Sequence, residues 1–216
     1  LQGVLAAPAA VALWISRFAP SLLSKPALDL LVVGAAAVDA VDLGRWYGVV
    51  PALAGGSTRV SVRLVGEELD GKFASTISRL APDISTILDM MPLAAWLERH
   101  PSAIPDLAVV FHPGFQKNRG WLDDGSLTAL LDRGMQVIVA SFGQDEFEMD
   151  SWVAEAHGFA ASGDMLMNPF SLDIGTDQSP ARWGSALWSL QRGGSVAAAM
   201  RASRLAALDE LTAMTM

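Results

Sequence analysis

The sequence predicts an α/β fold: a doubly wound, mostly parallel sheet with an N-terminal helix and a C-terminal helix. Short apolar or β-branched runs end at a glycine or a turn, as at residues 30–34, 60–66 and 107–111. Stretches with helical periodicity alternate with these runs. Strands and helices that alternate in this way specify a largely parallel sheet covered on both faces. In such sheets the usual binding place is the crevice beyond the carboxyl ends of the strands.

The length favours one domain. The chain has 216 residues, a mass of 22.8 kDa and 51% hydrophobic residues, which is enough to bury roughly 70–75% of the unfolded surface in one core. No repeat or long polar linker divides it. We therefore expect a single domain over 1–216, with an N-terminal helical segment at 1–27, the core at 28–170 and a C-terminal extension at 171–216.

The first expected element is a packed N-terminal helix within residues 1–23. This stretch is apolar enough to suggest a signal peptide, but Pro8, Arg17 and Pro20 interrupt it and no basic region precedes it. Because position 1 is leucine, an upstream domain or a removed leader stays open.

The first half of the core is expected to hold three strands and three helices. Trp46, Tyr47, Val50 and Leu53 recur at helical spacing, and a proline after His100 disfavours further helix there. The strands are expected at 28–33, 59–65 and 84–90, and the helices at 41–54, 71–80 and 92–99.

The second half continues the alternation. Gly134 and Gly158 are placed to end two helices, since glycine favours the left-handed conformation that follows a helix. The strands are expected at 107–111, 136–141 and 159–167, and the helices at 125–133, 147–157 and 195–214. Four of the seven tryptophans fall within helical apolar patterns and are expected in the core: Trp46, Trp96, Trp152 and Trp188.

Composition excludes several classes of function. A formal charge of −8 disfavours binding to nucleic acid or to an anionic membrane, because both attract clustered Lys and Arg. The absence of cysteine excludes disulfides, thiolate zinc sites and a cysteine nucleophile, and three scattered histidines predict no metal site. The sequence has no GxSxG, GxxxxGK[ST] or HExxH motif. We expect a cytoplasmic protein.

An ordered set of short motifs resembles a known family. The chain carries VVGAAAVD at 32–39, LVGEEL at 64–69, PDLAVVFHPGF at 105–115, QVIVASFGQDE at 136–146 and NPF at 168–170. This series resembles the C-terminal domain of mitochondrial splicing suppressor 51-like proteins, which often follows a MYND zinc finger. The resemblance implies a Rossmann-like, methyltransferase-like core and, in eukaryotes, a role in mitochondrial translation and assembly. The zinc finger is absent here, and His112 stands where the family more often has asparagine.

A methyltransferase-like core implies a site for a nucleotide-like ligand such as S-adenosylmethionine. A glycine turn after the first strand lets the ligand approach the backbone, and a carboxylate after the second strand holds the ribose hydroxyls. Gly34 and either Glu67 or Glu68 are the candidates, and Asp39 either lines the crevice or caps a helix. The alternative is that Gly34 and Gly66 only form tight turns and that both glutamates are solvated.

The run FHPGF at 111–115 supplies the catalytic candidates. It loosely resembles the Asn/Asp-Pro-Pro-Tyr/Phe motif of amine-directed methyltransferases, which implies that His112 accepts a hydrogen bond or a proton and that the Phe115 ring packs on the acceptor. Pro113-Gly114 is also the dipeptide that a type II turn prefers, so the alternative is a run that only reverses the chain.

Two functions follow. The first is a non-catalytic, methyltransferase-like binding or assembly module with a protein partner, which requires no cofactor. The second is an S-adenosylmethionine-dependent methyltransferase that acts on an amine-type or protein acceptor. The acidic run at 144–150 is expected to favour a helix N-terminus, with a cation or a cationic partner as the alternative.

Overall fold

The computed structural model of the chain describes residues 2–35, 48–53, 58–69, 84–117, 119–169 and 186–193. Within these ranges the strands are β1 Ala27–Val33, β2 Arg59–Val65, β3 Ile84–Asp89, β4 Leu107–Phe111, β5 Gln136–Ser141, β6 Phe159–Met167 and β7 Ala186–Arg192. The helices are α1 Gln2–Phe18, the 3₁₀ helix η1 Pro20–Ser24, α2 Val49–Leu53, α3 Leu93–Arg99, α4 Gly120–Asp123, α5 Ser126–Asp132 and α6 Gln144–Ala156. The strands form one sheet in the order β3-β2-β1-β4-β5-β7-β6.

The predicted doubly wound sheet is confirmed. The pairs β1–β2, β2–β3, β1–β4 and β4–β5 are all parallel. The strand order runs outward from β1 to β3 on one side and resumes at β4 on the other, so it reverses between β1 and β4. In an open α/β sheet this switch point is where ligands bind.

The strand β7 was not expected from the sequence. It lies between β5 and β6 and is antiparallel to both. Its first five residues, Ala-Leu-Trp-Ser-Leu, are all buried, and only Ser189 among them is polar, so apolar and polar residues do not alternate along the strand. Periodicity cannot distinguish such a run from buried helix. The prediction that Trp188 lies in a helix was therefore wrong, although its side chain is fully buried as expected.

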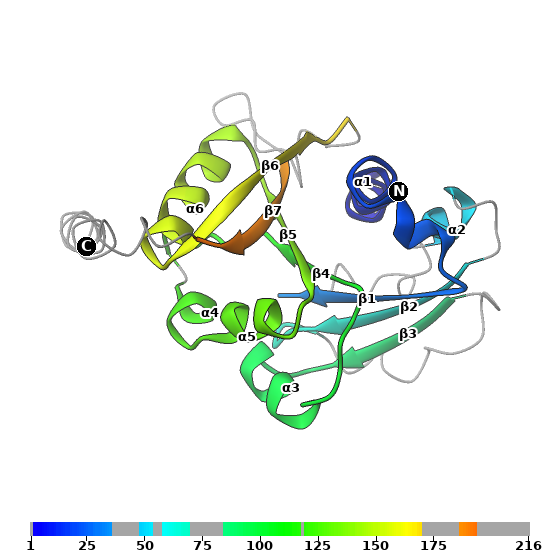
Figure 1. Ribbon diagram of the computed structural model, residues 1–216, viewed down its shortest axis with the longest axis horizontal. Coiled ribbons are helices and arrows are strands. Elements are labelled where there is room, and N and C mark those ends of the chain that lie inside the picture. The colour runs from blue at the N-terminus through cyan, green and yellow to red at the C-terminus, as the bar shows by residue number, and fades with distance from the viewer. Residues whose placement is uncertain are drawn as a thin grey trace.

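Two hydrophobic cores lie on opposite faces of the sheet. One contains residues of α1 and α2, and the other contains residues of α3, α4, α5 and α6. Figure 1 shows α1 and α2 on one side of β1 and β2, and α3 and α5 on the other. Alternation along β1 divides its side chains, since Leu30 and Val32 enter the first core and Leu31 and Val33 the second.

Most described helices agree with the sequence-based expectation. The N-terminal helix is confirmed as α1, and no helix among the described residues is long and apolar enough to span a membrane. Helix α6 begins three residues before the predicted start. Only 49–53 of the helix predicted at 41–54 is described as helix. The helices predicted at 71–80 and 195–214 lie outside the described residues, as does Trp46.

The backbone turns after β1 and β2 touch each other. The Ala35 N–H donates to the Val65 carbonyl over 3.0 Å, and the Gly66 N–H donates to the Asp89 carbonyl over 3.2 Å. A Cβ at Gly66 would lie 1.9 Å from the Ala35 carbonyl oxygen. Only glycine permits this approach, so Gly66 joins the ends of three neighbouring strands.

Substitution Gly66→Ala should therefore be strongly destabilising. We expect a loss of about 3 kcal/mol or more in the free energy of unfolding, because the clash is with backbone and cannot be relieved by a rotamer change. The matched control is Gly134→Ala, where φ is +77° but nothing lies within 4 Å of the new Cβ. It should lose only about 1–2 kcal/mol for the left-handed conformation. Urea unfolding of both variants measures the difference, and equal losses would contradict the clash.

Candidate functional site

The structure brings most of the predicted site residues to one edge of the sheet. Gly34 follows β1, Glu67 and Glu68 follow β2, and His112 follows β4. Both glutamates follow β2, where a ribose-binding carboxylate was expected, and both side chains are exposed. Asp39 lies outside the described residues.

The space over Gly34 is occupied by an indole. Gly34 has φ +73°, and a Cβ built on it would lie 2.6 Å from Cη2 of Trp121 and 3.2 Å from its Cζ2. Trp121 belongs to α4 and packs against the second core. Because Gly34 has no side chain, the Trp121 indole can pack against its backbone. This is the place where a cofactor was expected to approach the backbone.

His112 is held in a strained and largely apolar position. Its φ of +46° is unusual for a residue other than glycine. Its ring stacks on that of Phe142, with 3.7 Å between centroids and 16° between planes. Burial lowers the pKa of His112 to about 4, so the ring is neutral near pH 7. A neutral imidazole accepts one hydrogen bond in the plane of its ring, and Phe142 covers one of its two faces.

Phe115 lies in the core. Its side chain is fully buried in the second hydrophobic core, and its backbone N–H donates to Asp150 Oδ1 over 2.7 Å. Gly114, the residue before it, has φ +51°. This placement agrees with the alternative in which the 111–115 run reverses the chain, and it leaves no exposed Phe115 ring for an acceptor to stack on.

A buried polar network behind this run was missed from the sequence. Besides Phe115, Asp150 contacts Ser141, whose hydroxyl donates to Asp150 Oδ2 over 3.4 Å and accepts from Trp188 Nε1 over 3.2 Å. The sequence analysis placed Asp150 in the acidic run at 144–150, which was expected to favour a helix N-terminus. The available signal was its spacing, because Val153 and Ala154 follow three and four residues later on the same buried helix face.

Two carboxyls on α6 have perturbed titration. Burial, with a smaller contribution from the charge of Glu146, raises the pKa of Asp150 to about 7. Burial also raises the pKa of Glu146, against the opposing effect of the hydrogen bond that its carboxylate accepts from the Phe142 N–H. Glu146 thus fixes the backbone of the residue whose ring covers His112. No three His, Asp or Glu side chains in the described part of the chain form a group suited to a metal ion.

Comparison of the sequence with family models and with curated proteins finds no match. These results give no support to the specific resemblance to splicing suppressor 51-like proteins.

The structural similarities are remote. A Thermoplasma acidophilum protein assigned as a methyltransferase is 12% identical over 83% of this chain and 76% of its own, with a TM-score of 0.48. The precorrin-6y C5,15-methyltransferase of Geobacter metallireducens is 12% identical over 85% and 86%, with a TM-score of 0.39. Human methyltransferase-like protein 13 in complex with SAH is 15% identical over 93% and 90%, with a TM-score of 0.40. The fold class rests on the strand order itself.

The raised pKa of Asp150 predicts a pH-dependent stability. The folded-state value of about 7 lies above the ordinary value of 3.8, so the folded protein retains a proton that the unfolded chain releases. Its stabilising contribution is complete below about pH 4 and is lost as the pH rises through about 7. Asp150→Asn removes this titration and keeps an acceptor for the Phe115 N–H. We expect the stability of the wild type relative to D150N to fall as the pH rises from about 4 to about 7.

The comparison between the two proteins isolates Asp150 from its neighbours. The lowered pKa of His112 has the opposite effect, because its stabilising contribution is lost as the pH falls from about 6.5 through about 4. His112 and Glu146 are present in both proteins, so their effects largely cancel in the difference. Urea unfolding at several pH values measures it, and parallel pH profiles would contradict the assignment to Asp150.

Proposed function

We propose that this chain is a methyltransferase-like Rossmann domain that acts as a non-catalytic binding or assembly module for a protein partner. The observation that carries the proposal is the Trp121 indole packed on Gly34. In a dinucleotide-type or methyltransferase-type site, the glycine after the first strand is where the ligand lies against the backbone. Here a side chain of the protein itself lies there.

The state of the FHPGF run supports the same proposal. A group that accepts a proton near neutral pH works best with a pKa near the working pH. Burial holds the pKa of His112 at about 4, and its ring is stacked on Phe142. Phe115, the second catalytic candidate, is buried with 0% exposure.

The alternative function is an S-adenosylmethionine-dependent methyltransferase acting on an amine-type or protein acceptor. The observation that favours it is the exposure of Glu67 and Glu68 directly after β2, where a carboxylate would hold the ribose. In this alternative Gly34 and Asp39 also belong to the cofactor site, and His112 with Phe115 to the acceptor site. Trp121 would then have to move away from Gly34 when the cofactor binds.

Two further expectations remain part of the proposal. One is the resemblance to the C-terminal domain of splicing suppressor 51-like proteins, which implies a role in assembly. The other is a cytoplasmic location.

Calorimetric titration with S-adenosylmethionine and S-adenosylhomocysteine tests the proposal. We expect no binding to the wild type at ligand concentrations up to about 1 mM, which corresponds to a binding free energy weaker than about −4 kcal/mol. Binding in the micromolar range would overturn the proposal in favour of the enzyme.

Two sets of variants identify the cause of either result. If the wild type binds, Glu67→Gln with Glu68→Gln should abolish binding while leaving the unfolding free energy within about 0.5 kcal/mol, because both side chains are exposed. If it does not bind, Trp121→Ala opens the space at Gly34, and Trp121→Phe is the matched control that keeps an aromatic ring. Binding by the alanine variant alone would identify the indole as the blocking group.

A further inference from the structure

The side chain of His157 connects the end of α6 to α4. His157 follows the last residue of α6, and its Nδ1 lies 2.9 Å from the Val153 carbonyl oxygen. Its Nε2 lies 3.0 Å from Oδ1 of Asp123, the last residue of α4. The His157 side chain is 9% exposed, whereas that of Asp123 is 61% exposed. One largely buried imidazole therefore bridges two helices that are distant in sequence.

These two contacts require a positively charged ring. A carbonyl oxygen and a carboxylate oxygen can only accept hydrogen bonds, so both ring nitrogens of His157 must donate. A neutral imidazole has a single N–H and can serve only one of the two acceptors. The position also favours a cation, because it is the negative end of the α6 dipole and the last turn of α6 contains no basic residue. The geometry is that of an imidazolium paired with the Asp123 carboxylate.

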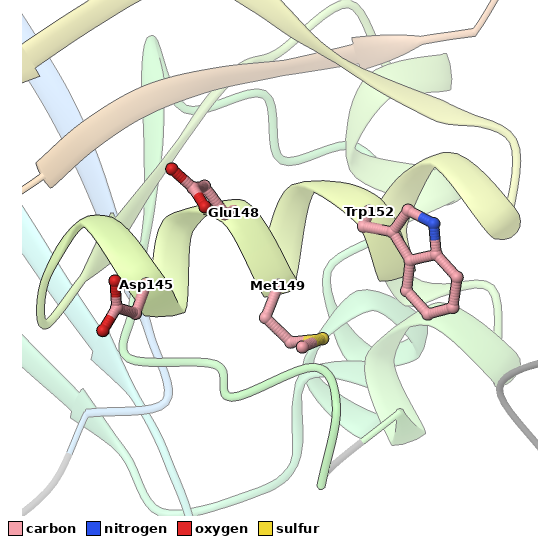
Figure 2. Close-up of a pocket in the computed structure, with 4 residues that line it drawn as sticks. All are labelled: Asp145, Glu148, Met149 and Trp152. Atoms are coloured by element: carbon pink, nitrogen blue, oxygen red, sulfur yellow. The ribbon is translucent and has the colours of Figure 1, made fainter. Parts of the chain in front are cut away.

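The carboxylates on the exposed face of α6 are too distant to compete for this ring. Figure 2 shows Asp145 and Glu148 along the helix, where they line a cavity of about 510 Å³ together with Met149 and Trp152. Both stand at least nine residues before His157, which is about 13 Å along the helix axis. That separation exceeds the screening length of about 8 Å at physiological salt.

The charged side chains on the elements around His157 have other contacts or other directions. Glu155 stands two residues before His157, a spacing at which helical side chains do not face each other. Glu146 and Asp150 accept from backbone N–H groups after β5 and β4. Beside α4, Asp124 accepts the Ser126 N–H, and Arg192 of β7 pairs with Asp132. The remaining charged side chain on these elements is that of Arg119, which precedes α4.

The pair with His157 fixes the helix that carries Trp121. Helix α4 has four residues and no side-chain hydrogen bond at its N-cap, and so short a helix depends on tertiary contacts for its position. One such contact is the burial of Leu122 in the second core. A second is the indole of Trp121 on Gly34. The third is the ion pair at the last residue of the helix.

We propose that the His157–Asp123 pair is a proton-dependent latch that holds α4, and with it the Trp121 indole, on Gly34. The inference rests on the proposed function, which the indole at Gly34 carries. Histidine is the side chain that ordinarily gains or loses its proton between about pH 5 and 8. At the acidic end of this range the imidazolium donates to both acceptors and the latch is closed. When the ring loses its proton, one acceptor loses its hydrogen bond and α4 is released from α6.

Hydrogen–deuterium exchange of α4 in the full chain tests the latch. The N–H groups of residues 122–124 donate to carbonyls at the start of α4, so their exchange reports the opening of this helix. In His157→Asn the side-chain amide can still donate to the Val153 carbonyl but is too short to reach Asp123. At about pH 5.5 these N–H groups should exchange about three- to tenfold faster in H157N than in the wild type. At about pH 8, where histidine is ordinarily neutral, the ratio should fall toward one.

The ratio at each pH separates His157 from the other titrating groups, since Asp150 and Glu146 are present in both proteins. The matched control is Asp132→Ala, which removes an exposed carboxylate from a different ion pair, the one with Arg192. It should leave the exchange of residues 122–124 unchanged at both pH values. Equal exchange in H157N and the wild type at about pH 5.5, or a ratio that does not change with pH, would overturn the latch.

A second measurement follows the indole itself. In protein labelled with fluorotryptophan, the fluorine resonance of Trp121 is identified by its absence from Trp121→Phe, and its shift between light and heavy water measures solvent exposure. H157N should increase this exposure at about pH 5.5 but not at about pH 8. An indole equally exposed in both proteins at the lower pH would overturn the latch.

Failure of the latch and failure of the proposed function give different results. Micromolar binding of S-adenosylmethionine to the wild type would overturn the proposed function, while a pH-dependent ratio of exchange in the same protein would still support the latch. Absence of binding together with exchange that does not depend on His157 would overturn the latch alone.

Discussion

The hydrogen bonds of the buried Asp150 carboxyl hold together the edge of the sheet at which the candidate site lies. The carboxyl accepts the Phe115 N–H from the turn after β4 and contacts Ser141 at the end of β5, and Ser141 in turn accepts from Trp188 on β7. A buried charge is costly unless it is paired, and the raised pKa of Asp150 is the response to that cost. One side chain on α6 thus connects three segments that are distant in sequence, including the antiparallel strand.

The same helix determines the surroundings of His112. Glu146 accepts the Phe142 N–H one turn before Asp150, and Phe142 places its ring on His112. The His112 N–H in turn donates to the Ala140 carbonyl over 2.8 Å. The loops after β4 and β5 are therefore joined by backbone and side-chain contacts together. Such a joined pair of loops favours a fixed, neutral imidazole over one that exchanges protons with solvent.

The sequence predicted the elements that local pattern determines and missed those that depend on distant contacts. The strands β1, β2 and β4 follow from apolar runs that end at turns, and the doubly wound sheet follows from their alternation with helices. The strand β7 was missed because five consecutive buried residues have no period. The burial of Asp150 was missed because the residue belongs to an acidic run. The contact of Trp121 with Gly34 was missed because the two residues are distant in sequence and no local pattern indicates that they meet.

Gly34, which was expected in the cofactor site, and Gly66, which follows β2, show why a lone glycine is weak evidence for a ligand. A glycine admits any close neighbour, whether a ligand, a side chain or another part of the backbone. At Gly66 the neighbour is the Ala35 carbonyl, and at Gly34 it is the Trp121 indole. Contacts within the protein therefore explain why glycine is required at both positions, and no ligand is needed to explain it. A cofactor at Gly34 would have to displace a partly buried indole from the second core, and its binding free energy would be reduced by the cost of exposing that apolar surface.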